Sequence, residues 1–298
     1  MPTWNEILSN IQNTENIYDT TRRKYIKELS EYTNRNTIIY YSAFLQKEQL
    51  ARQGAEFSIH DADKNGFMSA VHKLDKSIGL DLILHTPGGN ISATESIVFY
   101  LKSIFGNNIR AIVPQIAMSA GTMIACACKE IIMGKHSNLG PIDPQFGGLP
   151  AHGIIEEFDK AKEEVINDNR CILVWREISQ RYNPTLIGEC QKAIEWADKM
   201  VSEWLRENMF EKDDDREIIV NKIITELGSH ANTLSHSRHI HIDKLKSLGL
   251  KILELETDND LQDKVLSVHH STIISMSQTK CIKIIENQIG TAVVNTFG

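Results

Sequence analysis

Two short motifs contain the residues whose types and spacing could do chemistry. The first is His85-Thr86-Pro87-Gly88-Gly89, a turn that supplies bare backbone N–H groups. The second is Ala117-Met118-Ser119-Ala120-Gly121, which presents a serine hydroxyl between small residues. A hydroxyl that faces an anion-binding backbone turn is the minimal apparatus for acyl transfer.

The elements that precede the motifs must bring them together. Each motif closes a strongly apolar run, Leu80–Leu84 or Ile109–Pro114, and each opens an apolar-periodic segment typical of a helix. Two strand-to-helix turns in one parallel sheet lie side by side at the carboxyl ends of their strands, where open α/β sheets bind ligands. The spacing therefore predicts one site shared by both turns.

Ser119 is predicted to be the nucleophile, because small neighbours allow a tight strand-to-helix turn to present one side chain to a cleft. The alternative is an ordinary serine that caps a helix. The backbone N–H groups of Gly88 and Ala120 would form the oxyanion hole, with Gly89 in the same donor turn. Such donors typically contribute about 2.7–4 kcal/mol each to transition-state stabilisation. The alternative for the glycines is a plain Pro-Gly turn.

The sequence does not identify a single general base. Lys160 and Lys162 stand on a predicted helix, His152 at its start and Asp143 in the loop before it. Lys162 borders the apolar stripe of that helix, whereas Lys160 lies nearly opposite. A lysine held against apolar packing loses hydration, which favours the neutral amine that a general base needs. The alternative is that both lysines are solvated surface residues.

The wider pattern predicts an α/β fold with a parallel sheet and right-handed crossovers. Helical segments between residues 3 and 33 precede predicted strands 36–44, 80–86, 109–114 and 130–134, which alternate with helices 61–76, 91–105 and 119–128.

The second half of the chain is predicted to be mostly helical. A turn-rich loop at 137–150 leads into a helical stretch at 151–226 with breaks at Pro184 and Asp213–Asp215. A helix at 243–248 ended by Gly249, an apolar run at 250–255 and a strand at 282–285 follow. We expect a single domain over 1–298, with an N-terminal helical extension (1–35), a core that carries the active site (36–150) and a helical region with C-terminal elements (151–298).

Composition and charge indicate which classes of partner the protein lacks. A chain of 298 residues with 41% hydrophobic content can bury a large core, and a net charge of −7 with interspersed signs gives no nucleic-acid footprint. No stretch approaches the roughly 20 apolar residues of a membrane span, and the start of the chain lacks a secretory signal. These features predict a soluble cytoplasmic protein. The five scattered cysteines are expected to be reduced and mostly buried.

No cofactor or metal is expected. Asp61, Asp63 and Asn65 match the first half of an EF-hand calcium loop, but His72 stands at its twelfth position, so a helix start with Asp61 or Asp63 as the cap is predicted instead. Six late histidines are interpreted as polar loop and helix positions: His230, His236, His239, His241, His269 and His270. No Gly-x-Gly-x-x-Gly dinucleotide fingerprint is present.

Three stretches make the chain resemble the serine dehydrogenase proteinase family, relatives of signal peptide peptidase A in the Clp protease/crotonase superfamily. They are Asp81–Gly89, Ala117–Thr122 and Leu139–Gln145. The resemblance implies a crotonase-type ββα spiral with a serine nucleophile at Ser119 and oxyanion donors at Gly88 and Ala120. It also implies ATP-independent cleavage of peptides or unfolded proteins by a homo-oligomer.

The related families differ in their general base. Signal peptide peptidases use a Ser–Lys dyad whose lysine comes from a helix after the Gly-Pro loop, a location that suits Lys160 or Lys162. Clp proteases instead place a histidine in the loop region where this chain has Ile142-Asp143. That departure argues against a Ser-His-Asp triad here.

The sequence thus predicts a soluble serine peptidase with a lysine as its general base and a substrate cleft that includes His85, Pro141 and Asp143. A crotonase-type acyl-CoA enzyme is a second hypothesis, but it would need a catalytic carboxylate where Ser119 stands. A catalytically inactive scaffold or adaptor that keeps the fold is a third.

Overall fold

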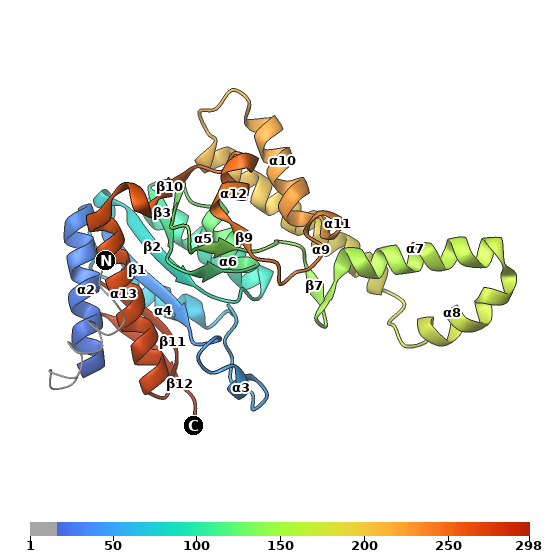
Figure 1. The fold of residues 1–298 in the computed structure, drawn as a ribbon, viewed down its shortest axis with the longest axis horizontal. Coiled ribbons are helices and arrows are strands. Elements are labelled where there is room, and N and C mark those ends of the chain that lie inside the picture. The colour runs from blue at the N-terminus through green and yellow to red at the C-terminus, as the bar shows by residue number, and fades with distance from the viewer. Residues whose placement is uncertain (1–16) are drawn as a thin grey trace.

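The computed structural model describes residues 17–298 and has a mixed α/β fold built on one seven-stranded sheet (Figure 1). In spatial order, its strands are β10 (Ile252–Glu254), β5 (Glu130–Met133), β3 (Ile109–Val113), β2 (Leu80–His85), β1 (Asn36–Ser42), β11 (Cys281–Asn287) and β12 (Ala292–Thr296). The strands from β10 to β1 pair in parallel, whereas β11 and β12 add antiparallel partners. This architecture confirms the predicted fold class.

Helices cover both faces of the sheet, which explains why its central strands are apolar on both sides. Along β1, Ile38 and Tyr40 pack into the core on one face, and Ile39 and Tyr41 pack into the core on the other. The first face is covered by α4 (Asp63–Val71), α5 (Ile91–Phe105) and α6 (Ala120–Cys126), the second by α2 (Ile17–Thr33) and α13 (Asn259–Gln278) (Figure 1).

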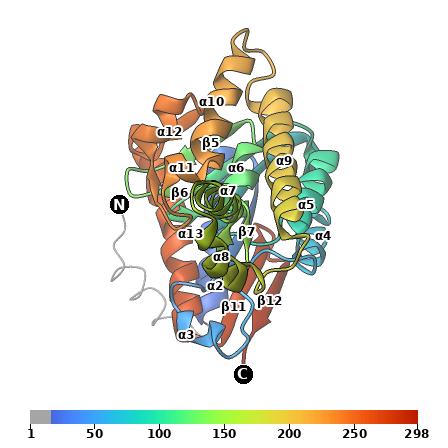
Figure 2. The ribbon, with the colours of Figure 1, turned by 90° about the vertical axis from the view of Figure 1, so that its right-hand side faces the viewer.

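An arm of two helices projects away from this body (Figures 1 and 2). It consists of α7 (Ala151–Asn167) and α8 (Ile172–Ser179), and α9 (Leu186–Trp204) returns the chain to the core. The helical stretch and its breaks at Pro184 and Asp213–Asp215 are confirmed. The remaining helices longer than a single turn are α10 (Arg216–Gly228) and α12 (Ile242–Leu248), and the single-turn α3 (Glu48–Ala51) and α11 (His230–Thr233) lie in the connections.

A small three-stranded sheet joins distant parts of the chain beside the main one. It contains β4 (Ile116–Ala117), β6 (Asn138–Leu139) and β9 (Ile240–His241), with β6 antiparallel to β9. The segment before β9 is therefore carried next to the loop that follows β6. That loop contains the hairpin of β7 (Gln145–Phe146) and β8 (Leu149–Pro150).

Besides the two-residue strands and single-turn helices, two longer elements were not predicted from the sequence. The helix α13 was not recognised because many of its buried side chains are polar and interrupt its apolar stripe, among them His269, Ser271 and Thr272. The edge strand β12 is short and partly exposed. The helix predicted at 61–76 is limited to α4. The first part of the helical N-terminus, residues 1–16, lies outside the described residues.

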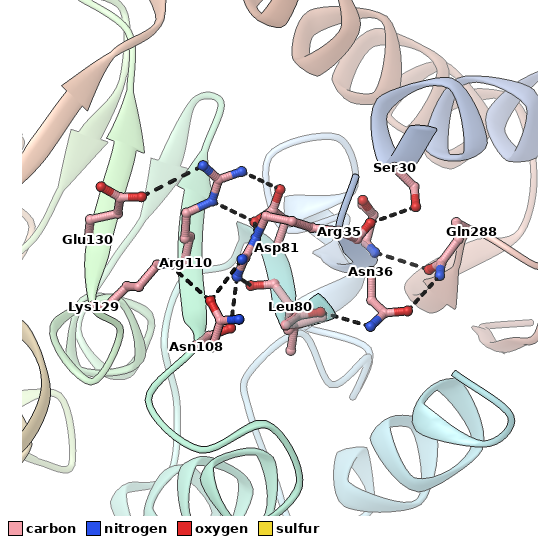
Figure 3. Close-up of polar contacts among 12 residues, drawn as sticks. Ser30, Arg35, Asn36, Leu80, Asp81, Asn108, Arg110, Lys129, Glu130 and Gln288 are labelled. Carbon is pink, nitrogen blue, oxygen red and sulfur yellow. Dashed lines mark hydrogen bonds and ion pairs between the residues drawn. The ribbon is translucent and has the colours of Figure 1, made fainter. Parts of the chain in front are cut away.

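A buried carboxylate fixes the amino ends of the central strands (Figure 3). The Asp81 side chain at the start of β2 is fully buried and accepts hydrogen bonds from Arg35 Nε (2.7 Å) and from Arg110 Nε and Nη2 (2.7 Å each). Arg35 Nη1 also reaches Asn108 Oδ1 at 2.8 Å. This network lies at the opposite end of β2 from the glycine turn, so it holds the strand in place without entering the site.

Within residues 17–298, none of the helices has both the length and the apolar character needed to cross a bilayer.

Candidate active site

The two predicted turns lie side by side and are joined by their backbones. Thr86 N donates to Ile116 O at 3.2 Å, and Met118 N donates to Thr86 O at 3.0 Å. These bonds form a parallel bridge between Thr86 and Ala117. They place the glycine turn after β2 directly against the serine turn after β3 and β4, as the sequence predicts.

Ser119 occupies a strained backbone conformation at the start of α6. Its φ of 50° and ψ of −115° are unusual for a residue with a side chain, and such conformations cost roughly 1–3 kcal/mol. Ser119 stands at the N-cap position, yet its side chain makes no capping hydrogen bond within the described chain. The geometry thus disfavours a capping role and leaves the hydroxyl available for chemistry.

Gly88 can approach Ser119 only because it lacks a side chain. Its φ is +100°, and a Cβ placed there would lie 2.7 Å from Ser119 Cβ and 2.7 Å from Met118 O. Gly88 N–H currently donates to Thr86 Oγ1 at 3.1 Å, so an oxyanion here would compete with that hydroxyl. Ala120 is the first residue of α6, and its N–H is one of those that a helix leaves without an internal acceptor.

The glycine turn is held from behind by the segment before α4. Ile59 N donates to Gly88 O at 2.7 Å, and Asn90 N donates to Ile59 O at 2.9 Å. A Cβ on Gly89 would lie 2.3 Å from Ile59 N, so this close backbone contact requires glycine. The predicted donor turn is therefore fixed between Ile59 on one side and the serine turn on the other.

A buried ion pair supports the same segment. Lys283 Nζ contacts Asp63 at 3.0 Å and Ser58 O at 2.8 Å, and both charged side chains are 1% exposed. Burial lowers the pKa of Lys283, and Asp63 opposes that shift. Asp63 also accepts hydrogen bonds from Tyr40 Oη (2.7 Å) and His60 N (3.1 Å), so the sequence motif that resembled a calcium loop supplies an internal anchor.

Ser119 lines a cavity of about 400 Å³ between the two turns and the loop after β6. The loop contributes Asp143, and the segment before β9 contributes His236. His236 Nδ1 lies 2.9 Å from Asp143 Oδ1, and Gln145 Nε2 donates to Asp143 Oδ2 at 3.0 Å. The other lining residues include Gly88, Gly89, Met123, Ile142, Phe146 and Trp196.

Not all of the residues predicted to line the cleft do so in the structure. Asp143 lines the cavity although its side chain is fully buried, whereas Pro141 is buried beside it and is not among the lining residues. His85 is fully buried and points to the opposite face of the sheet, against Tyr41, Phe44 and His269. This placement corrects the expectation for His85, because side chains alternate between faces along β2.

Burial of His85 predicts a loss of stability in acid. Desolvation lowers the pKa of His85 to about 3 from an ordinary 6.5, and neither ring nitrogen has a hydrogen-bond partner in the described chain. Below pH 6.5 the unfolded chain takes up a proton that the folded chain rejects, so the free energy of unfolding falls as pH drops toward 3. Between pH 7 and pH 5 we expect a loss of roughly 2 kcal/mol from this residue.

Urea denaturation of wild type and His85→Phe at pH 7 and pH 5 measures this effect. Phenylalanine keeps the aromatic packing without the titrating ring, so the variant should lose less stability between the two pH values. His269 will keep part of the slope, because burial also lowers its pKa well below the ordinary value. Equal slopes in both proteins would contradict the assignment.

The two lysines proposed as general base lie on the arm. The side chains of Lys160 and Lys162 are 57% and 68% exposed, and they pair with Glu157 (3.9 Å) and Asp159 (2.7 Å) on the same helix. Neither is among the residues that line the Ser119 cavity of this described chain. A lysine general base therefore remains a prediction. The positions of these two lysines in a single chain do not favour it.

Sequence reasoning missed His236. It was one of six late histidines, and Asp143 and His236 are separated by 93 positions. The local sequence offered one indication, the apolar Ile240 next to a polar segment. In the structure Ile240 belongs to β9, which pairs with β6. The pairing of two-residue strands cannot be read from a pattern so short.

Comparisons with known proteins identify a family and two relatives. Residues 7–287 match the family described as ClpP-like SDH-type serine proteinases. The uncharacterised protein MJ1495 from Methanocaldococcus jannaschii is 33% identical over 190 residues, which cover 64% of this chain and 57% of that protein. A second uncharacterised protein of that organism, MJ0137, is 30% identical over 235 residues, covering 78% of this chain and 73% of its own. The chain therefore spans little more than half of MJ1495 but about three quarters of MJ0137. On the extent of the family match, the chain belongs to the ClpP-like SDH-type serine proteinases.

Proposed function

We propose that this protein is an ATP-independent serine peptidase in which Ser119 is the nucleophile. The observation that carries the proposal is the strained backbone of Ser119, whose hydroxyl caps no helix and lines a cavity beside Gly88. Strain of this kind persists only when the surrounding structure imposes it, and it clusters at reactive positions. The backbone N–H groups of Gly88 and Ala120 would stabilise the oxyanion.

The substrate class that fits is a peptide or an unfolded protein segment. The cavity combines apolar walls from Ile142, Phe146 and Trp196 with the glycine turn, Gly88 and Gly89. The β7–β8 hairpin forms its own two-stranded sheet, and both β7 residues line the cavity. An extended peptide could add to such an edge through main-chain hydrogen bonds while one side chain enters the cavity.

The resemblance also implies a homo-oligomer, which we retain as part of the proposal. The arm exposes large apolar side chains that a neighbouring copy would cover: Ile166, Ile172, Leu173, Val174 and Ile178. A cytoplasmic location stays a prediction of the sequence.

Covalent labelling tests the nucleophile. A fluorophosphonate probe should label the wild-type protein, and mass spectrometry of the digested adduct should locate the probe on Ser119. Ser119→Ala should take up no probe, since the attacking oxygen is gone. Labelling retained in Ser119→Ala would refute the assignment, and a wild type that neither takes up the probe nor cleaves unfolded protein would favour the inactive scaffold.

A further inference from the structure

His236 and Asp143 form a polar pair inside the cavity that holds the serine. We propose that His236 is the general base for Ser119 and that Asp143 is the residue that positions it. This inference rests on the proposed function, because a base is needed only if Ser119 attacks a substrate. It replaces the lysine expected from related families with a histidine that comes from another part of the chain.

The contact between the two side chains fixes the state of the imidazole. A carboxylate oxygen accepts hydrogen bonds, so the 2.9 Å contact between His236 Nδ1 and Asp143 Oδ1 requires the proton on Nδ1. In the neutral imidazole the lone pair is then on Nε2, and this tautomer can accept a proton from a serine hydroxyl. The Asp143 carboxylate is itself held by Gln145 Nε2 and is fully buried, so it presents a fixed partner.

The exposure of the pair matches these two roles. The His236 side chain is 26% exposed, which leaves it reachable from the cavity, whereas Asp143 behind it has no exposure. A buried carboxylate that orients an imidazole and a partly accessible imidazole that exchanges protons are the arrangement that such relays need. Both residues and Ser119 line the one cavity.

The small sheet explains how distant residues meet. The pairing of Asn138 with His241 and of Leu139 with Ile240 brings the segment before β9 to the loop after β6. Clp proteases place a histidine in this loop, but here the loop supplies the carboxylate and the later segment supplies the histidine. The departure that argued against a triad from the sequence is thus compatible with one whose members come in a different chain order.

A second histidine near Asp143 provides a matched control. His230 Nδ1 lies 3.6 Å from Asp143 Oδ2, yet in the described structure His230 lines the groove of the arm and not the Ser119 cavity. The two histidines share the carboxylate but differ in access to the serine. Of the two histidines, only His236 lines the cavity that also contains Ser119.

The chemistry balances with these groups alone. As the Ser119 oxygen bonds to the scissile carbonyl carbon, its proton passes to His236 Nε2 and the carbonyl π electrons move to the oxyanion. The protonated imidazole then gives that proton to the leaving amine as the C–N bond breaks. Water repeats the two steps to release the acyl group and regenerate the serine.

The rate of fluorophosphonate labelling tests the inference in the full chain. His236→Ala and His236→Gln should lower the second-order labelling rate by roughly 10²–10⁴-fold. Asp143→Asn should lower it by at least roughly 10-fold with the probe still directed to Ser119, because the amide no longer holds the Nδ1–H tautomer. His230→Gln, Lys160→Ala and Lys162→Ala should label like the wild type. Circular dichroism and thermal melting confirm that each variant is folded.

Added imidazole separates a chemical role from a structural one. It should restore labelling of His236→Ala, where it can occupy the vacated space, and should do nothing for Ser119→Ala. Wild-type rates in both His236 variants would overturn the inference while leaving Ser119 as the nucleophile. A comparable loss in His230→Gln, or loss in a lysine variant with His236→Gln unaffected, would also overturn it. Absence of labelling in the wild type would overturn the proposed function and this inference together.

Discussion

Exchanging Ser119 for glycine is expected to remove peptide hydrolysis and at the same time to stabilise the fold. Hydrolysis should fall by on the order of 10⁶-fold, because a serine nucleophile and its base act as one unit. The free energy of unfolding should rise by about 1 kcal/mol, since glycine adopts the φ of 50° without the steric cost that serine bears. Hydrolysis of a labelled unfolded protein and urea denaturation measure the two effects.

Ser119→Ala is the matched control for this prediction. It loses the same hydroxyl but keeps the Cβ that causes the strain, so it should lose hydrolysis without the gain in stability. A Ser119→Gly variant that is less stable than Ser119→Ala would show that the backbone strain has been assigned to the wrong residue. The comparison separates the cost of holding the nucleophile from the chemistry that it performs.

Replacing Lys283 by methionine is expected to have the largest effect on stability. The change leaves the Asp63 carboxylate, which is 1% exposed, without its lysine partner, and such a loss typically costs about 3–5 kcal/mol. It also removes the contact with Ser58 O that supports the neighbour of Ile59, behind the glycine turn. We therefore expect weaker labelling of Ser119 in the protein that remains folded. Chemical denaturation monitored by circular dichroism gives the change in stability.

The double variant Lys283→Met/Asp63→Asn tests the cause. Asparagine removes the uncompensated charge but keeps an oxygen for Tyr40 and His60, so the double variant should recover much of the lost stability. Asp63→Asn alone should be destabilised, because it isolates the Lys283 ammonium. A double variant no more stable than Lys283→Met would mean that packing, and not charge, is the origin of the effect.

The strands and turns of the site were predictable from the sequence because their signals are local. The apolar runs before His85 and Ile116 are buried on both faces, and the glycines and small residues that follow meet backbone atoms at close range. Ala117 and Gly121 are small for a reason that the structure makes visible, since a Cβ on Gly121 would lie 2.5 Å from Thr86 Cγ2. Residue type and spacing therefore predicted the positions of Ser119, Gly88 and Ala120.

The orientation of His85 and the position of His236 could not be predicted, because they depend on contacts between distant segments. The face on which His85 points follows from the register of β2, and a period of two does not say which face holds the cleft. The pairing of His236 with Asp143 depends on β9, which is two residues long. A lysine at the edge of an apolar stripe was a reasonable choice of base, but the stripe of α7 faces a groove within the arm and not the cavity of Ser119.

A long stretch of chain separates Asp143 from His236, and the two side chains meet at 2.9 Å in the proposed reaction centre. Within that stretch Gln145, Phe146 and Trp196 line the same cavity, and α7 begins beside it, since Ala151 N donates to Pro144 O at 2.9 Å. The outer part of the arm, α8 and the distal turns of α7, projects away from the cavity (Figure 1) and contributes none of its lining residues. Since the entropy of closing a loop grows only slowly with loop length, this outer part can lengthen, shorten or change partner at little thermodynamic cost to the site. The length and surface of the outer arm can therefore diverge while the proposed acid–base pair stays unchanged.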